Sequence, residues 1–83
     1  MQLHQLKTLP EHFQAVWDRK KRAELRKDDR NFAVGDDLLL QEWKNDRYTG
    51  RAMLCVVKHK LVGGPWLAEG YAMLSIRVLE RRP

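Results

Sequence analysis

Hydrophobic and polar residues alternate in several stretches of the chain, as they do in β-strands that bury one face. The alternation is clearest after Gly70, where apolar residues stand at positions 72, 74, 76 and 78. Residues 22–26 alternate as well, with Ala23 and Leu25 on one side of a half-buried strand and the charged residues on the other. Further strands are expected over residues 3–6, 38–43 and 52–57, the last extended toward solvent by residues 58–60.

One stretch has helical spacing instead. A capping box from Thr8 to Glu11, with Pro10 in the first turn, predicts the start of a helix. Its apolar stripe consists of Phe13, Val16 and Trp17. The next positions of the stripe are charged, so the helix is expected to end near residues 19–21.

Turns are expected where polar residues and glycines cluster. These places are residues 27–31, 34–37, 45–50, where Gly50 supplies backbone freedom, and 63–65. One helix and about five mostly antiparallel strands predict an α+β domain, with the sheet curled into a small barrel and the helix at one end. At 83 residues, the whole chain 1–83 is expected to form this single domain.

Charge adds a candidate function. The formal net charge is +5, and residues 19–30 contain seven basic and three acidic side chains. Such clustering is typical of proteins that bind polyanions, because each phosphate they neutralise releases counterions. A solvated face that keeps a small protein soluble is the plain alternative.

Composition excludes other classes. One cysteine allows no internal disulfide and no cysteine-based zinc site, and the three histidines are scattered, so we expect no metal and no cofactor. The longest apolar run, residues 53–57, is far shorter than a membrane-spanning helix. Without an apolar leader at its start, the chain is expected to be cytoplasmic, without a membrane partner and monomeric.

Ordered segments along the chain resemble the ASCH family, a branch of the PUA-like β-barrel superfamily, and especially its short, phage-associated members of unassigned function. The family motif G-x-K-x-x-E-x-R matches residues 19–26, where Lys21, Glu24 and Arg26 fit and Arg19 stands in place of the glycine. The other matching segments are residues 4–7, 29–32, 34–39, 48–51, 69–71 and 74–76.

This resemblance implies a small barrel with an RNA-binding cleft beside the motif. Some ASCH members are similar to amidohydrolases that remove an acyl group from modified cytidine. In that branch the motif lysine works with a threonine, at the position of Glu24 here, and with a further glutamate, for which Glu69 is the candidate.

Candidate binding residues follow from the charge cluster and the motif together. They are Lys21, Arg22, Glu24 and Arg26, with Lys7, Arg30 and Arg51 as possible extensions of the same basic wall. Arginine presents a planar fork that suits phosphate or a base edge, and Glu24 is placed to orient one of them. The alternative roles are a cation at the helix C-terminus for Lys21 and a surface ion pair between Glu24 and Arg26.

Other notable side chains have plainer expected roles. His4 is expected to be a hydrogen-bonded structural residue, and Cys55 an inert packed thiol. Asp36 next to Asp37 indicates turn chemistry rather than a catalytic pair. Trp17 completes the helical stripe and is assigned to the core, whereas for Trp43 and Trp66 base stacking and capping of the barrel ends stay open.

Three functions therefore remain. The first is an RNA- or nucleotide-binding module that uses a basic cleft. The second is an amidohydrolase for an acylated or otherwise modified nucleoside such as N4-acetylcytidine, with Lys21 as base or nucleophile and Glu24 or Glu69 as its partner. The third is a phage-type accessory protein whose basic face docks onto a host protein.

Overall fold

Five strands and one helix make up the computed structural model, which describes residues 1–83. They follow one another as β1 (Leu3–Thr8), α1 (Pro10–Trp17), β2 (Ala23–Lys27), β3 (Asp37–Lys44), β4 (Arg47–Val62) and β5 (Tyr71–Arg82). All five strands join one sheet in the order β1-β3-β4-β5-β2. Strands β1 and β3 run parallel and the other neighbours antiparallel, so the predicted mostly antiparallel α+β composition is confirmed.

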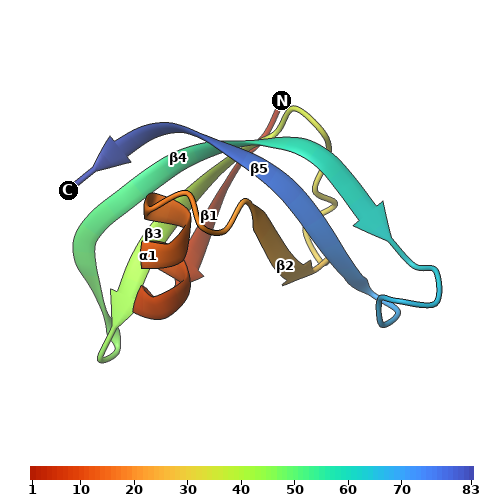
Figure 1. Cartoon of the computed structure of the whole chain (residues 1–83), viewed down its shortest axis with the longest axis horizontal. Coiled ribbons are helices and arrows are strands. Elements are labelled where there is room, and N and C mark those ends of the chain that lie inside the picture. The colour runs from red at the N-terminus through yellow and green to blue at the C-terminus, as the bar shows by residue number, and fades with distance from the viewer.

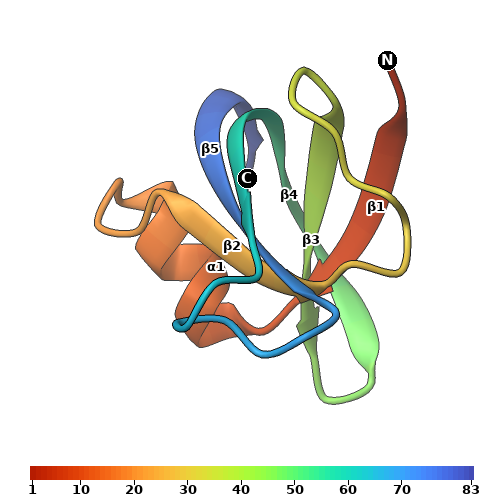
Figure 2. The same cartoon turned by 90° about the vertical axis from the view of Figure 1, so that its right-hand side faces the viewer.

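The sheet bends into a half-barrel, and α1 lies in its hollow side (Figure 1). Two irregularities in the pairing of β4 with β5, between Leu54 and Cys55 and between Val57 and His59, lie along the bend. Bulges of this kind increase the local twist and bend of a strand. Strands β1 and β2 are the two edge strands (Figure 2), and the bend brings them near enough for Arg26 of β2 to reach the Lys7 carbonyl of β1.

The core fills the space between α1 and the sheet. Phe13 and Val16 of the helix join apolar side chains from every strand except β2, and Trp17 packs beside them, as its place in the helical stripe predicts. Cys55 is fully buried, and its burial raises the pKa of the thiol to about 12, with the Glu24 carboxylate adding to the rise. The predicted inert thiol is therefore confirmed.

The helix is shorter than the sequence predicts, and its start is different. Thr8 belongs to β1, and its hydroxyl donates to the Leu6 carbonyl rather than capping α1. Leu9 occupies the N-cap position without a side-chain hydrogen bond, and Pro10 opens the helix. The predicted capping box is wrong, because the chain is still extended at Thr8, where it pairs with Glu42 of β3.

The β3–β4 hairpin is also tighter than expected. Its turn consists of Asn45 and Asp46, both with positive φ (53° and 60°), which is the geometry of a type I′ turn. The predicted connection over 45–50 is therefore too long. Gly50, with φ of 100°, lies inside β4. The pairing of β3 with β4 is irregular at this point, because Gln41 pairs with Ala52 but Trp43 pairs with Tyr48.

Strand β2 forms where the alternation predicts it, but its charged side is the one turned inward. Glu24 is 4 % exposed, whereas Leu25 is 54 % exposed. The polar side of β2 can be buried because it lies against the edge strand β1 as well as against the apolar core. The main-chain carbonyls of β1 accept hydrogen bonds from the polar side chains of β2. No helix of the structure is long and apolar enough to cross a membrane.

Candidate functional site: a basic hollow at the end of the helix

A hollow of about 410 Å³ lies between the C-terminal end of α1 and the strand β5. Val16, Ile76 and Val78 give it an apolar floor. Four cationic side chains surround that floor: Arg19, Lys21, Arg22 and Arg77. No carboxylate lines the hollow, so its electrostatic potential is positive and its floor suits a flat apolar group.

The cations of the hollow are not neutralised within the protein. Arg19, Arg22 and Arg77 form no ion pair and no side-chain hydrogen bond, and Lys21 Nζ contacts only the Nδ1 atom of His12, at 3.4 Å. Guanidinium groups without partners keep their donors available for an anion.

A helix-ending turn brings these side chains together. The N–H of Lys20 donates to the Ala15 carbonyl at 2.9 Å, and the N–H of Arg19 to the Val16 carbonyl at 3.0 Å. This is the Schellman pattern, which requires a left-handed residue after the helix, and Arg19 adopts it with φ of 61°. Arg19 thus occupies a backbone conformation that favours glycine.

Lys21 is not the helix-end cation that the sequence suggested. The helix ends at Trp17, and the N–H of Lys21, rather than its ammonium group, donates to the Ala15 carbonyl at 3.1 Å. Lys21 is instead one of the residues that line the hollow. The carbonyl of Trp17 accepts from Arg81, through Nε at 3.2 Å and Nη2 at 3.0 Å.

Glu24 and Arg26 form a second polar region, which we call the seam because it joins the two edge strands. Arg26 Nε donates to Glu24 Oε2 at 2.6 Å, and Arg26 Nη2 donates to the Lys7 carbonyl of β1 at 2.7 Å. The predicted pairing of these two side chains is confirmed. The pair is not a surface pair, however, because the Glu24 side chain is only 5 % exposed.

Two more of the predicted basic residues also bind β1 or its neighbours. Arg30 Nη1 donates to the Gln5 carbonyl at 2.7 Å, so it belongs to the seam. The Lys7 ammonium lies 4.1 Å from the ring centre of Trp43, which meets Tyr48 edge to face. Cationic side chains thus satisfy the unpaired carbonyls of an edge strand, a known protection against edge-to-edge pairing.

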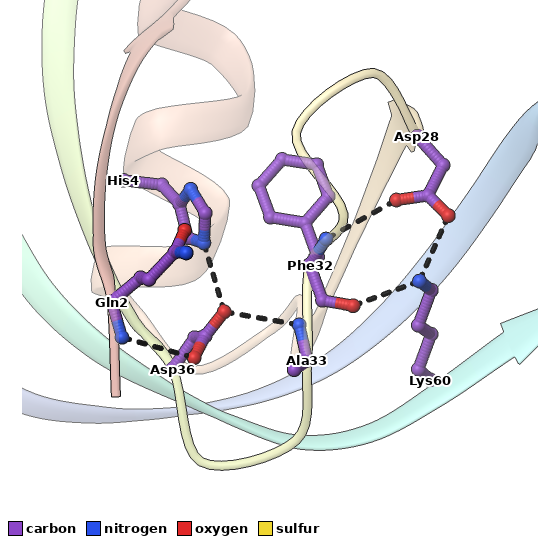
Figure 3. Close-up of polar contacts among 7 residues, drawn as sticks. All are labelled: Gln2, His4, Asp28, Phe32, Ala33, Asp36 and Lys60. Atoms are coloured by element: carbon purple, nitrogen blue, oxygen red, sulfur yellow. Dashed lines mark hydrogen bonds and ion pairs between the residues drawn. The ribbon is translucent and has the colours of Figure 1, made fainter.

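The loop between β2 and β3 is held by two buried or half-buried carboxylates (Figure 3). Asp36 accepts from His4 Nε2 at 2.9 Å and from the N–H groups of Gln2 and Ala33 at 3.1 Å, and these bonds lower its pKa. The predicted turn role of Asp36 and structural role of His4 are confirmed.

Asp28, at the start of the same loop, accepts from Lys60 Nζ at 2.8 Å and from the Phe32 N–H at 3.2 Å, and its pKa is lowered as well. Lys60 also donates to the Phe32 carbonyl at 2.8 Å (Figure 3). No three His, Cys, Asp or Glu side chains gather in a way that could hold a metal ion.

The structure therefore divides the predicted site. Lys21 and Arg22 line the hollow, whereas Glu24, Arg26 and Arg30 make the seam. Glu69 is exposed in the β4–β5 connection, next to Gly70, whose carbonyl binds the N–H of Asp28 beyond the far end of β2. Since a strand rises ~3.3 Å per residue, Glu69 is about 20 Å from Lys21, and the two share no pocket.

Two cations of the hollow were not among the predicted binding residues: Arg19, which belongs to the basic stretch, and Arg77. Arg77 lies in β5, on the polar side of the clearest alternation in the chain, and nothing near it in the sequence marks it as a site residue. The signal is tertiary: the pairing of β2 with β5 brings Arg22 beside Ile76, where the Ile76 N–H donates to the Arg22 carbonyl at 3.0 Å.

Of the remaining candidates, Arg51 and Trp43 pack against other side chains, whereas Trp66 does not. Arg51 lies over the ring of Trp17, with 4.5 Å to its centre, and donates to Gln14 at 3.1 Å. Trp66 is 87 % exposed in the β4–β5 connection. It is thus open to a ligand, whereas Trp43 is half-buried under Lys7.

Comparison with known proteins identifies relatives without supplying an activity. The chain is 39 % identical over 72 residues to the "Uncharacterized 12.9 kDa protein in GpA 3'region" of Escherichia phage P2. The match covers 87 % of this chain but 65 % of the relative, so the chain spans slightly less than two thirds of that protein's length. The expected similarity to phage proteins of unassigned function is confirmed. Residues 3–76 match the family described as "Domain of unknown function (DUF3850)", and the chain belongs to this family.

Proposed function

We propose that the protein binds RNA or a nucleotide, with the basic hollow as the phosphate-binding site. The single observation behind this proposal is that four cations surround one apolar-floored hollow while three of them have no partner in the protein. Unpaired charges are of little use to stability, since even exposed ion pairs contribute only about 0–1 kcal/mol. Their concentration in one place favours recognition of an anion.

The chemistry of the hollow suits a nucleotide in particular. Arg22 and Arg77 can each bind phosphate oxygens through two parallel N–H donors. The floor of Val16, Ile76 and Val78 offers apolar contact to a base or sugar. A volume of about 410 Å³ lies in the range typical of small-ligand pockets, which suits one nucleotide unit.

The finer fold assignment is part of the same proposal. A half-barrel with a helix in its hollow side is in keeping with an ASCH or PUA-like barrel, and the left-handed backbone at Arg19 is in keeping with the glycine of that motif. On this interpretation, the cleft beside the motif is the hollow, and the glutamate and arginine of the motif belong to the seam.

Binding of a labelled single-stranded RNA of about ten nucleotides, followed by fluorescence anisotropy, tests the proposal. Each phosphate neutralised on a single strand contributes about −0.7 to the slope of log affinity against log salt concentration. Four engaged cations therefore predict a slope of about −3. Arg22→Ala combined with Arg77→Ala is expected to weaken binding and to reduce the slope by about half.

The matched control removes the same charge elsewhere. Lys44→Ala combined with Arg47→Ala deletes two exposed cations from the β3–β4 hairpin, where neither forms an ion pair. This control is expected to leave the slope nearly unchanged. Absence of RNA binding at low salt, or equal losses in the two double variants, would contradict the proposed function.

A further inference from the structure

A group of large apolar side chains lies exposed on the outer face of β2, β5 and β4. Leu25, Met73 and Leu61 are neighbours across these strands, because Leu25 pairs with Met73 and Met73 with Leu61. They are 54 %, 37 % and 43 % exposed. Tyr71 follows two residues before Met73 on the same face of β5 and is 40 % exposed.

Trp66 lies in the connection that joins the end of β4, just beyond Leu61, to the start of β5 at Tyr71 (Figure 1). We call Leu25, Leu61, Trp66, Tyr71 and Met73 the outer patch. Contiguous exposed apolar surface on a small protein marks an interaction site more often than single scattered residues do. Two of its five members are aromatic, and Trp66, at 87 %, is nearly free of protein contacts.

The charges around the outer patch are positive. Lys27 pairs with Tyr71 across β2 and β5, and Arg77 lies on the same face of β5, beyond Ser75. The outward-facing positions of β2, and those of β5 from Tyr71 to Arg77, carry no acidic side chain. The carboxylates that flank this stretch of β5 are Glu69 in the adjoining connection and Glu80, which pairs with Leu54 farther along the strand. A positive surface with aromatic side chains is complementary to an anionic ligand that has flat, stackable groups.

The outer patch is continuous with the hollow through Arg77. Arg77 stands in the outward row of β5 that runs through Ser75 and Met73 to Tyr71, and it is also one of the residues that line the hollow. Pairing with β2 ends at Ile76, so the edge of β5 is open there, and a ligand can pass from the hollow onto the outer face. Tyr71 lies six residues, or about 20 Å, from Arg77.

We infer that the ligand of this protein is a single-stranded RNA that occupies the hollow with one nucleotide and then runs along β5 over the outer patch, where Tyr71 and Trp66 stack on its bases. This inference rests on the proposed function and extends it. A duplex does not fit the arrangement, because its bases are already stacked and paired. Base–aromatic stacking is the usual sequence-tolerant contact of single-strand binding, with sites of about four nucleotides or more.

The test compares a short and a long ligand. Affinities are measured for adenosine 5′-monophosphate, which fills only the hollow, and for a hexamer of adenylate, which can reach Tyr71. Tyr71→Ala and Trp66→Ala are each expected to weaken the hexamer about tenfold, which corresponds to loss of one stacked base. Neither variant should change the affinity for the mononucleotide.

Tyr48→Ala is the matched control, because Tyr48 is a tyrosine of similar exposure (49 %) in β4, away from the outer patch. It should leave both affinities unchanged. Fluorescence gives a second readout: the hexamer is expected to quench the emission of Trp66 and to protect it from acrylamide. All variants are checked by thermal melting, and exposed positions such as Trp66 are expected to melt close to the wild type.

The outcomes separate the inference from the function on which it rests. In one outcome, Arg22→Ala with Arg77→Ala weakens binding of the hexamer while Tyr71→Ala and Trp66→Ala do not. The path over the outer patch is then wrong, and the hollow alone binds RNA. The outer patch would in that case be a surface for a protein partner. If the wild type binds neither ligand, the proposed function fails as well. Equal loss for both ligands in Trp66→Ala overturns the inference, because it shows an effect that is not stacking.

Discussion

Both the hollow and the seam contain arginines, but only those of the seam have hydrogen-bond partners within the protein. In the seam, Arg26 and Arg30 donate to a carboxylate and to the carbonyls of β1. In the hollow, Arg22 and Arg77 have no partner within the protein. Arg22 comes from the same basic stretch as Arg26 and Arg30, and it is only four residues from Arg26, whereas Arg77 comes from β5.

This difference teaches that a cluster of positive charge in a sequence is not one functional unit. The sheet bends until its edges are near enough for a β2 side chain to reach the β1 main chain, and arginines at that point contribute to stability. Arg22, which precedes the other end of β2, lines the hollow. The first group should therefore matter for folding and the second for binding, and each prediction below tests one side of this comparison.

The largest effect is expected from breaking the seam. Arg26→Ala leaves the Glu24 carboxylate buried without its cation and frees the Lys7 carbonyl, so the free energy of unfolding should fall by about 3 kcal/mol. Arg22→Ala, its counterpart in the hollow, should stay within about 0.5 kcal/mol of the wild type. Urea denaturation followed by circular dichroism measures both.

A second variant distinguishes loss of the pair from loss of a side chain. Glu24→Met combined with Arg26→Met removes both charges and leaves no buried carboxylate, so it should be more stable than Arg26→Ala. If Arg26→Ala and Arg22→Ala destabilise equally, the contrast between the seam and the hollow does not hold.

A smaller effect is expected where β1 meets the β2–β3 loop. Asp36 accepts three hydrogen bonds as a carboxylate, so Asp36→Asn should cost about 2 kcal/mol at neutral pH. Because the pKa of Asp36 is lowered in the folded protein, its stabilisation is present above the ordinary value of 3.8 and is lost as the pH falls through the lowered value.

The melting temperature of the wild type should therefore drop steeply below about pH 4, and the drop should be shallower in Asp36→Asn. Asp29→Asn is the control, since Asp29 is exposed and makes no side-chain contact. An acid transition of unchanged steepness in Asp36→Asn would exclude this carboxylate as its cause. Asp28, whose pKa is also lowered, is expected to contribute to the drop that remains in Asp36→Asn.

The smallest effect has the opposite sign and lies in the hollow. Arg19 has a left-handed backbone, so Arg19→Gly should relieve strain and raise the free energy of unfolding by about 1 kcal/mol. The same change removes one cation from the hollow and should weaken RNA binding. Denaturation and anisotropy measured on one preparation should show a higher free energy of unfolding and a lower RNA affinity. A rise in both quantities would contradict a binding role for Arg19.

Local patterns in the sequence were sufficient for much of the fold. The alternation after Gly70 and the apolar run over residues 52–57 predicted β5 and the middle of β4, because each pattern depends on which face of one strand is buried. Lys21 and Arg22, which the charge cluster and the motif together predicted as binding residues, both line the hollow. The turn role of Asp36 and the structural role of His4 also followed from local chemistry.

Only the tertiary structure decided what each charge does. Which side of β2 is buried depends on the approach of β1. Arg26 of β2 donates to the carbonyl of Lys7 in β1, a residue 19 positions away along the chain. Arg77 enters the hollow because β5 pairs with β2, a contact between residues about fifty positions apart. A sequence pattern reports the environment of one element, whereas pairing between elements sets the partners of a side chain, and it is the presence or absence of those partners that separates a stabilising arginine from one free to bind a ligand.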